Sequence, residues 1–117
     1  MRGRRPRRLC PKGEGVDKDE QRGFTYLKKA CQGEVPEACF NLAGLQLFGT
    51  STKSLVDGLA SLGSACLLKH GESCFLLGSI SEGLIRVEGV EPDVETAKRY
   101  YKKACEAGLE LGCESAK

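Results

Sequence analysis

The chain has 117 residues, of which 40% are hydrophobic and 29% are charged, a composition that suits one globular domain. No apolar run approaches the ~18–20 residues of a membrane span, so we expect no membrane insertion. The formal charge of +2 hides an asymmetry, because the remainder beyond the first eight residues carries 13 basic against 16 acidic residues. The excess positive charge comes from Arg2, Arg4, Arg5, Arg7 and Arg8.

Residues 1–8 have no apolar periodicity and are predicted to form a disordered, Arg-rich arm. Such an arm is also typical of nucleic-acid binding, but it contains no aromatic residue to stack on bases, so we expect no nucleic-acid partner. A mitochondrial presequence would need Ser and apolar residues, and a secretory signal would need an apolar core; the arm has neither. We interpret it as a solvated tail or as a consequence of where the chain begins.

Residues 9–16 resemble the end of one helical hairpin followed by a connection to the next. They share Glu-Gly-Val followed closely by Asp with the stretch 87–93. This match predicts that the chain begins inside a repeat and that further repeats lie upstream. We therefore assign 9–117 to a repeat array, with repeats at about 11–50, 51–86 and 87–117.

The centre of the first repeat holds two Ala-Cys dipeptides, with Cys31 and Cys39 eight residues apart. Between them, Gly33 is typical of a helix end and Pro36 of the first residue of a new helix. The pattern therefore predicts an antiparallel helix pair with both cysteines at its turn.

The same unit occurs three times, and the first cysteines of successive units are 35 and 39 residues apart. Counting back from the first cysteine of each unit gives an N-cap type at twelve residues, a small residue at eight and a large one at four. The last two positions share one helix face with the cysteine. Such recurrence predicts an all-α array of helical hairpins. The recurring residues are Asp19, Ser54 and Asp93; Gly23, Gly58 and Ala97; and Leu27, Leu62 and Tyr101.

The helix boundaries follow from the same signals. Gly49 is predicted to end the second helix, and Ser54 with Asp57 resembles a capping box at the start of the third. The predicted helices cover about 19–31, 36–48, 54–66, 72–83, 93–105 and a short stretch to 116. On the second helix, the spacing predicts one packed face formed by Cys39, Leu42, Leu45 and Phe48.

Six of the seven cysteines obey the repeat, and Cys10 is left over as a predicted free thiol. Six cysteines allow 15 pairings, but pairing within each hairpin gives every repeat the same structure. The alternative is three pairs of buried free thiols in a reducing compartment. Zinc is disfavoured because the chain has no Cys-x-x-Cys and one His. The predicted disulfides are Cys31–Cys39, Cys66–Cys74 and Cys105–Cys113.

No catalytic constellation is predicted. His70, the single histidine, lies in the turn before the fourth helix, and we expect it to be an exposed loop residue. A Ser-x-x-Lys nucleophile motif is absent, and the nearest stretch is 50–53, Thr-Ser-Thr-Lys. We therefore expect no enzyme activity, no catalytic residue and no metal site.

The pattern Asp-x3-Ala-x2-Tyr-Tyr-Lys-Lys-Ala-Cys-x7-Cys over 93–113 resembles the cysteine-rich class of Sel-1-like repeats. Cys39-Phe-Asn-Leu and the stretch 13–19 add to the resemblance, whereas the second repeat lacks the Tyr-Lys-Lys core. The resemblance implies tetratricopeptide-like αα-hairpins stacked in a right-handed superhelix that works as an interaction scaffold.

Two branches of the family share these cysteine pairs. One is the secreted bacterial Hcp-type group, classed as a beta-lactamase family; the other is a mitochondrial cytochrome c oxidase assembly factor of the intermembrane space, which is linked to haem. The resemblance implies a non-enzymatic scaffold in complex IV assembly in the intermembrane space, with a secreted or periplasmic penicillin-binding or beta-lactamase-like protein as the alternative. Haem is implied by the resemblance alone, and the residues themselves predict no cofactor.

A protein partner of unknown identity is expected to contact the first helices of the hairpins. The positions five and six residues before the first cysteines lie one step off the packed face and mix aromatic, small and polar residues. Exposed Tyr and Arg are common binding anchors. The predicted contacts are Tyr26, Arg99 and Tyr100, with Lys29 and Lys103 at the rim.

Overall fold

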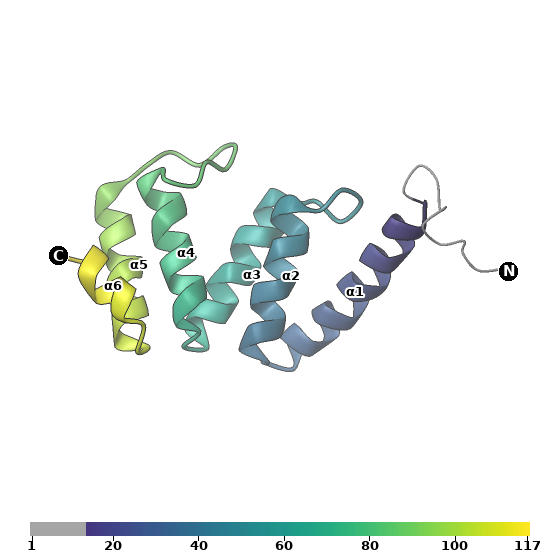
Figure 1. Ribbon diagram of the computed structural model, residues 1–117, viewed down its shortest axis with the longest axis horizontal. Coiled ribbons are helices and arrows are strands. Elements are labelled where there is room, and N and C mark those ends of the chain that lie inside the picture. The colour runs from purple at the N-terminus through teal and green to yellow at the C-terminus, as the bar shows by residue number, and fades with distance from the viewer. Residues whose placement is uncertain (1–13) are drawn as a thin grey trace, which may run out of the picture.

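A computed structural model of the chain describes residues 14–117, and within this part all regular structure is helical. The helices stand side by side along the long axis, with tight turns at one edge and longer connections at the other (Figure 1). This is the predicted α-solenoid of hairpins. The helices are α1 (Glu14–Gln32), α2 (Pro36–Phe48), α3 (Leu55–Leu67), α4 (Gly71–Glu82), α5 (Val94–Glu106) and α6 (Glu110–Ser115).

The three hairpins, α1–α2, α3–α4 and α5–α6, close with the same turn. The residue three positions after the first cysteine has a positive φ in each, at Glu34 (65°), Lys69 (70°) and Gly108 (100°). The next residue donates its N–H to the carbonyl just before the cysteine, at 3.0–3.2 Å. Only the third repeat places a glycine, the residue that favours this backbone region, at that position.

Each turn is bridged by a disulfide. The pairs are those predicted, with Cα atoms 4.6 Å apart for Cys31–Cys39, 4.8 Å for Cys66–Cys74 and 4.5 Å for Cys105–Cys113. The two helices of a hairpin are therefore held together next to the turn that joins them. Cys10 and the Arg-rich arm lie outside the described residues.

Successive hairpins pack second helix to first helix, α2 on α3 and α4 on α5. The core along these contacts is built from small and branched side chains with one buried aromatic, Tyr101, which is 3% exposed. Leu62, which lies at the equivalent position of α3, is fully buried. The face predicted from the positions four and eight residues before the cysteine is therefore buried in the second and third repeats.

The first helix is longer than predicted. It begins at Glu14, so Asp19 lies inside α1 and is not its N-cap residue. The segment before Asp19 contains Lys, Glu and Asp and no proline, and its one glycine does not stop the helix. An N-cap residue type is permitted inside a helix, so the type alone does not define the boundary.

The other two N-cap predictions are correct in position. Asp93 caps α5: its Oδ1 accepts hydrogen bonds from the backbone N–H of Glu95 at 3.1 Å and Thr96 at 3.5 Å. Ser54 occupies the N-cap of α3, but its side chain makes no capping bond, so the capping box with Asp57 does not form.

The predicted packed face of α2 is partly wrong. Phe48 is 64% exposed and Leu45 is only half-buried. The helix packs against α1 on one side and α3 on the other, so it buries residues around most of its circumference. A helix buried on two sides has no single apolar stripe for periodicity to find. Its buried residues are Ala38, Cys39, Leu42, Ala43, Gln46 and Leu47.

Candidate functional site

A groove of about 290 Å³ lies between the first helices α1 and α3, with α2 forming its floor. The solenoid therefore presents a hollow along first helices, where the sequence places the binding surface. Its lining residues are Phe24, Lys28, Cys31 and Gln32 from α1, Leu42 and Gln46 from α2, and Asp57, Ala60, Ser61 and Ser64 from α3.

The lining follows a register relative to the first cysteine of each hairpin. Upstream helix α1 contributes positions −7, −3, 0 and +1, whereas downstream helix α3 contributes positions −9, −6, −5 and −2. Residues two positions apart lie on nearly opposite sides of an α-helix. Each first helix therefore shows one set of residues to the following repeat and another set to the preceding one.

The groove combines apolar and polar groups. The Lys28 ammonium lies 5.6 Å from the centre of the Phe24 ring, a cation–π distance. Where α3 meets α2, the buried Ser61 hydroxyl donates to the buried Gln46 side-chain oxygen at 2.5 Å. Lys28 and Asp57 carry opposite charges, so the charged groups that line this groove balance. Such a mixed lining suits a polypeptide segment, which presents both amide groups and side chains.

The predicted contacts Tyr26 and Lys29 are exposed on α1 but do not line this groove. They occupy positions −5 and −2. In α3 these positions are Ser61 and Ser64, which line the groove toward α1. On α1 these positions face away from α3. Tyr26 is 72% exposed for this reason, whereas its equivalent Ser61 is buried.

The other predicted contacts, Arg99, Tyr100 and Lys103, lie together on α5 at positions −6, −5 and −2. These are the positions of Ala60, Ser61 and Ser64, so the register directs them toward α3. Arg99 and Lys103 are exposed, and Tyr100 is half-buried against the core. The structure thus groups three of the five predicted contacts on one helix and separates them from the two on α1.

None of the groove-lining residues is among the five predicted contacts. Apart from the disulfide-bonded Cys31, those that also lie outside the register positions from which the contacts were chosen are Phe24, Lys28, Gln32, Leu42, Gln46 and Asp57. Phe24 and Lys28 are one turn apart, but nothing local shows which side of α1 the next repeat covers. The sequence did contain one signal for the groove, because Gln46 is a polar residue between two leucines. The structure shows that Gln46 is buried.

His70 is not the exposed loop residue that we expected. It is the N-cap residue of α4, its side chain is 15% exposed, and its Nδ1 lies 2.7 Å from the Ser73 hydroxyl. Its ring lies 4.9 Å from the Phe40 ring, centre to centre. The imidazole is therefore part of the packing between α2 and α4.

Tyr101 is the one buried titratable residue on the α4–α5 contact. Its hydroxyl donates to Glu82 at 2.6 Å, and burial together with that carboxylate raises its pKa. The ring is covered by α4, so the phenol is placed for packing rather than for contact with a substrate.

Among the side chains of residues 18–117, no group of three or more His, Cys, Asp or Glu is placed to hold a metal ion. The described residues also fit haem poorly, because the six described cysteines are all in disulfides and His70 is engaged by Ser73 and Phe40. None of the described helices is long and apolar enough to cross a membrane.

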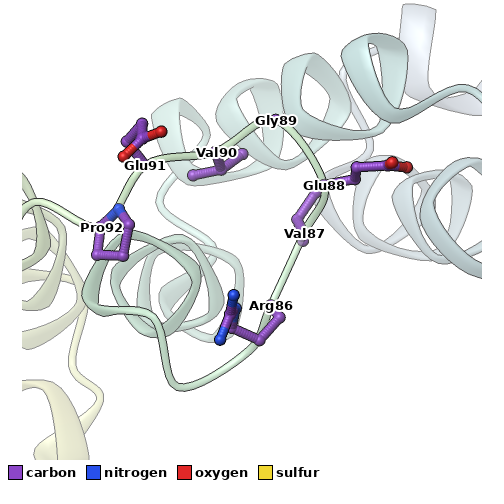
Figure 2. A pocket seen from close by; sticks show the side chains of 7 residues that line it. All are labelled: Arg86, Val87, Glu88, Gly89, Val90, Glu91 and Pro92. Carbon is purple, nitrogen blue, oxygen red and sulfur yellow. The ribbon is translucent and has the colours of Figure 1, made fainter.

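A second hollow, of about 500 Å³, lies on the connection between α4 and α5. All its lining residues, 86–92, belong to that one connection, and their side chains point in different directions rather than toward a common centre (Figure 2). It is the space under a looped segment and offers no converging groups for a ligand.

Taken together, these features define a solenoid of disulfide-linked αα-hairpins with a groove between the first helices α1 and α3. The chain matches the Sel1 repeat over residues 12–34, 36–60 and 71–109. It belongs to the Sel1 repeat family. The match covers the repeat and does not distinguish the mitochondrial from the secreted bacterial branch.

A crystal structure of a Sel1 repeat protein from Oxalobacter formigenes has the same fold, with a TM-score of 0.68 and 24% sequence identity. The alignment covers 89% of this chain and 42% of that protein, so this chain spans less than half of its length. No curated protein sequence matches the chain.

Proposed function

We propose that the protein is a non-enzymatic scaffold that holds a segment of a partner protein along the first helices of its hairpins. The observation that carries the proposal is the α1–α3 groove, which is open, mixed in polarity and walled by two successive repeats. The family supports it, because Sel1 repeats generally mediate protein–protein interactions. Three disulfides are typical of an oxidising compartment, which is where we place this activity.

A matched pair of variants tests the groove. Ala60→Arg adds a long side chain to an exposed groove position of α3, and Asn41→Arg adds the same side chain to an exposed position of α2 that does not line the groove. A photocrosslinking amino acid at Ser64 is used to capture the partner in its own compartment. We expect discrete crosslinks that Ala60→Arg abolishes and Asn41→Arg preserves, with helical content unchanged. Equal crosslinking in the two variants would contradict a partner in the groove.

The narrower roles implied by the resemblance are further proposals with separate tests. Cytochrome c oxidase assembly in the intermembrane space predicts that the captured partner is a subunit or assembly protein of that complex. The bacterial alternative predicts hydrolysis of a chromogenic cephalosporin by purified protein. We expect no hydrolysis, because no nucleophile–base pair was found in the sequence.

A further inference from the structure

We infer that the partner is an acidic, leucine-bearing segment and that it binds on the face between α3 and α5. This inference deepens the proposed function and rests on it. The face, called here the α3–α5 face, is defined by register from the residues that line the α1–α3 groove. It consists of Leu59, Gly63 and Leu67 on α3 and Arg99, Tyr100 and Lys103 on α5.

The register transfers because the same positions of α3 and α5 are buried against the preceding hairpin. Positions −8 and −4 are Gly58 and Leu62 on α3 and Ala97 and Tyr101 on α5, and all four are buried. The floor residue Leu42 is 4% exposed, and its equivalent in the next hairpin, Leu77, is 6% exposed. The α3–α5 face therefore repeats the α1–α3 arrangement with different side chains.

The chemistry of the two walls differs. The α3 wall is apolar: Leu67 is 74% exposed and Leu59 is half-buried. The only charged residue of α3 is Asp57, which lines the other groove. The α5 wall presents two exposed cations, Arg99 and Lys103, on either side of Tyr100 in the helix register.

Neither cation has an ion-pair partner among the described side chains. Within residues 18–117, no carboxylate lies within 4.0 Å of Arg99 or Lys103. Arg99 lies close enough to Asp93 to help to lower the pKa of that carboxyl, but the hydrogen bonds from Thr96 are the main cause. The face therefore combines uncompensated positive charge with exposed leucine surface, which is complementary to carboxylates alternating with apolar side chains.

A narrow segment fits better than a membrane or a nucleic acid. Leu59 and Tyr100 are half-buried on two different first helices, so a ligand must reach between helices to contact both. A flat lipid surface contacts the outermost groups only. A nucleic acid would be expected to engage all the cations of α5, including Lys98 and Lys102, which the register turns away from α3.

The two cation pairs of α5 provide the test. Arg99→Gln with Lys103→Gln removes two charges from the α3–α5 face, and Lys98→Gln with Lys102→Gln removes two charges from the other side of the same helix. The probe is a short fluorescein-labelled peptide in which Asp and Glu alternate with Leu, and the control peptide replaces every acidic residue with Lys. Fluorescence anisotropy measures binding at low and raised NaCl.

We expect the acidic peptide to bind the wild type and the Lys98/Lys102 variant, and the Arg99/Lys103 variant to lose at least ~10-fold in affinity. Leu67→Ser should weaken binding at any salt concentration. Equal losses in the two charge variants, or binding of phosphatidylserine vesicles or duplex DNA in place of the peptide, would overturn the inference.

The peptide-binding test and the crosslinking test of the proposed function can fail independently of each other. If the Ser64 crosslinks respond to Ala60→Arg but the peptide does not distinguish the charge variants, the scaffold stands and the acidic ligand is wrong. If the peptide distinguishes the charge variants but Ala60→Arg leaves the crosslinks unchanged, the face binds acidic segments and the α1–α3 groove is not the contact.

Discussion

At both junctions between hairpins a large side chain packs against a glycine. The two junctions differ in which helix carries the glycine and which carries the large side chain. At the α2–α3 junction the first helix supplies the glycine, Gly58, and the second helix supplies Leu47. At the α4–α5 junction the second helix supplies the glycine, Gly78, and the first helix supplies Tyr101. Both junctions therefore allow the two helices to approach closely, but the side chain that packs against the glycine comes from the second helix in one and from the first helix in the other.

The two junctions also differ in the polar contacts near them. A carboxylate on α1, Glu20, accepts hydrogen bonds from Thr50, Ser51 and Thr52 in the α2–α3 connection, at 2.8–3.3 Å. The equivalent position is Leu55 in the second repeat and Val94 in the third. The first hairpin is therefore tied at its turn by a disulfide and at its open end by a carboxylate, whereas the α4–α5 junction depends on an aromatic ring.

The largest expected effect is at that ring. Tyr101→Ala should destabilise the protein by about 3–5 kcal/mol, because it removes a buried aromatic and leaves a cavity beside Gly78. Urea unfolding with the disulfides intact measures the change. Tyr101→Phe, which removes the hydroxyl and its contacts with Glu82 and Ser79 but keeps the ring, should cost about 1 kcal/mol. A loss below about 1 kcal/mol for Tyr101→Ala would show that the junction does not depend on the ring.

Alanine at the two glycines sharpens the comparison. A Cβ on Gly78 would lie 2.6 Å from a Tyr101 ring carbon, and the rigid ring can move only as a whole. Overpacking costs roughly 1–3 kcal/mol and exceeds the ~1 kcal/mol that alanine contributes to helix propensity, so Gly78→Ala should be destabilising. Gly58→Ala should also be destabilising, because its Cβ would lie 2.6 Å from Cγ of the buried Leu47 and 3.3 Å from Cβ of Gln46.

Gly63→Ala is the matched control for both glycine variants, since nothing lies within 4 Å of a Cβ placed there. It should stabilise the protein by about 0.5–1 kcal/mol. Thermal unfolding of the three variants under one condition is the measurement. A Gly78→Ala protein as stable as Gly63→Ala would contradict the assigned close contact.

The smallest effect concerns the Glu20 carboxylate and appears only with pH. The hydrogen bonds from Thr50, with those from Ser51 and Thr52, lower the pKa of Glu20 from 4.5 to about 2. A lowered folded-state pKa means that the carboxylate stabilises the fold above pH ~4.5 and that this contribution is lost as the pH falls toward about 2. Glu20→Gln should therefore flatten the fall in melting temperature between neutral pH and pH ~3.

Glu88→Gln, in the exposed α4–α5 connection, is the control for charge removal. It should leave the pH dependence of the melting temperature close to that of the wild type. Identical pH profiles for Glu20→Gln and the wild type would mean that the hydrogen bonds to the Glu20 carboxylate contribute nothing to stability.

The features that the sequence by itself determined are those set by neighbours along the chain. Pro36 and Gly49 bound α2 at the predicted residues, and Asp93 caps α5, because helix ends depend on the backbone groups of a few adjacent residues. The cysteine pairing belongs to this class as well. A spacing of eight across a tight turn brings the two Cα atoms within bridging distance whenever the hairpin forms.

The tertiary structure decided which surfaces are covered. Phe48 is exposed and His70 is packed, and Tyr26 is exposed while the equivalent Ser61 is buried, because burial depends on the neighbouring repeat rather than on adjacent residues. The groove shows the same dependence. Phe24 and Lys28 line it only because α3 lies on their side of α1, and that placement follows from how α2 packs between the two first helices.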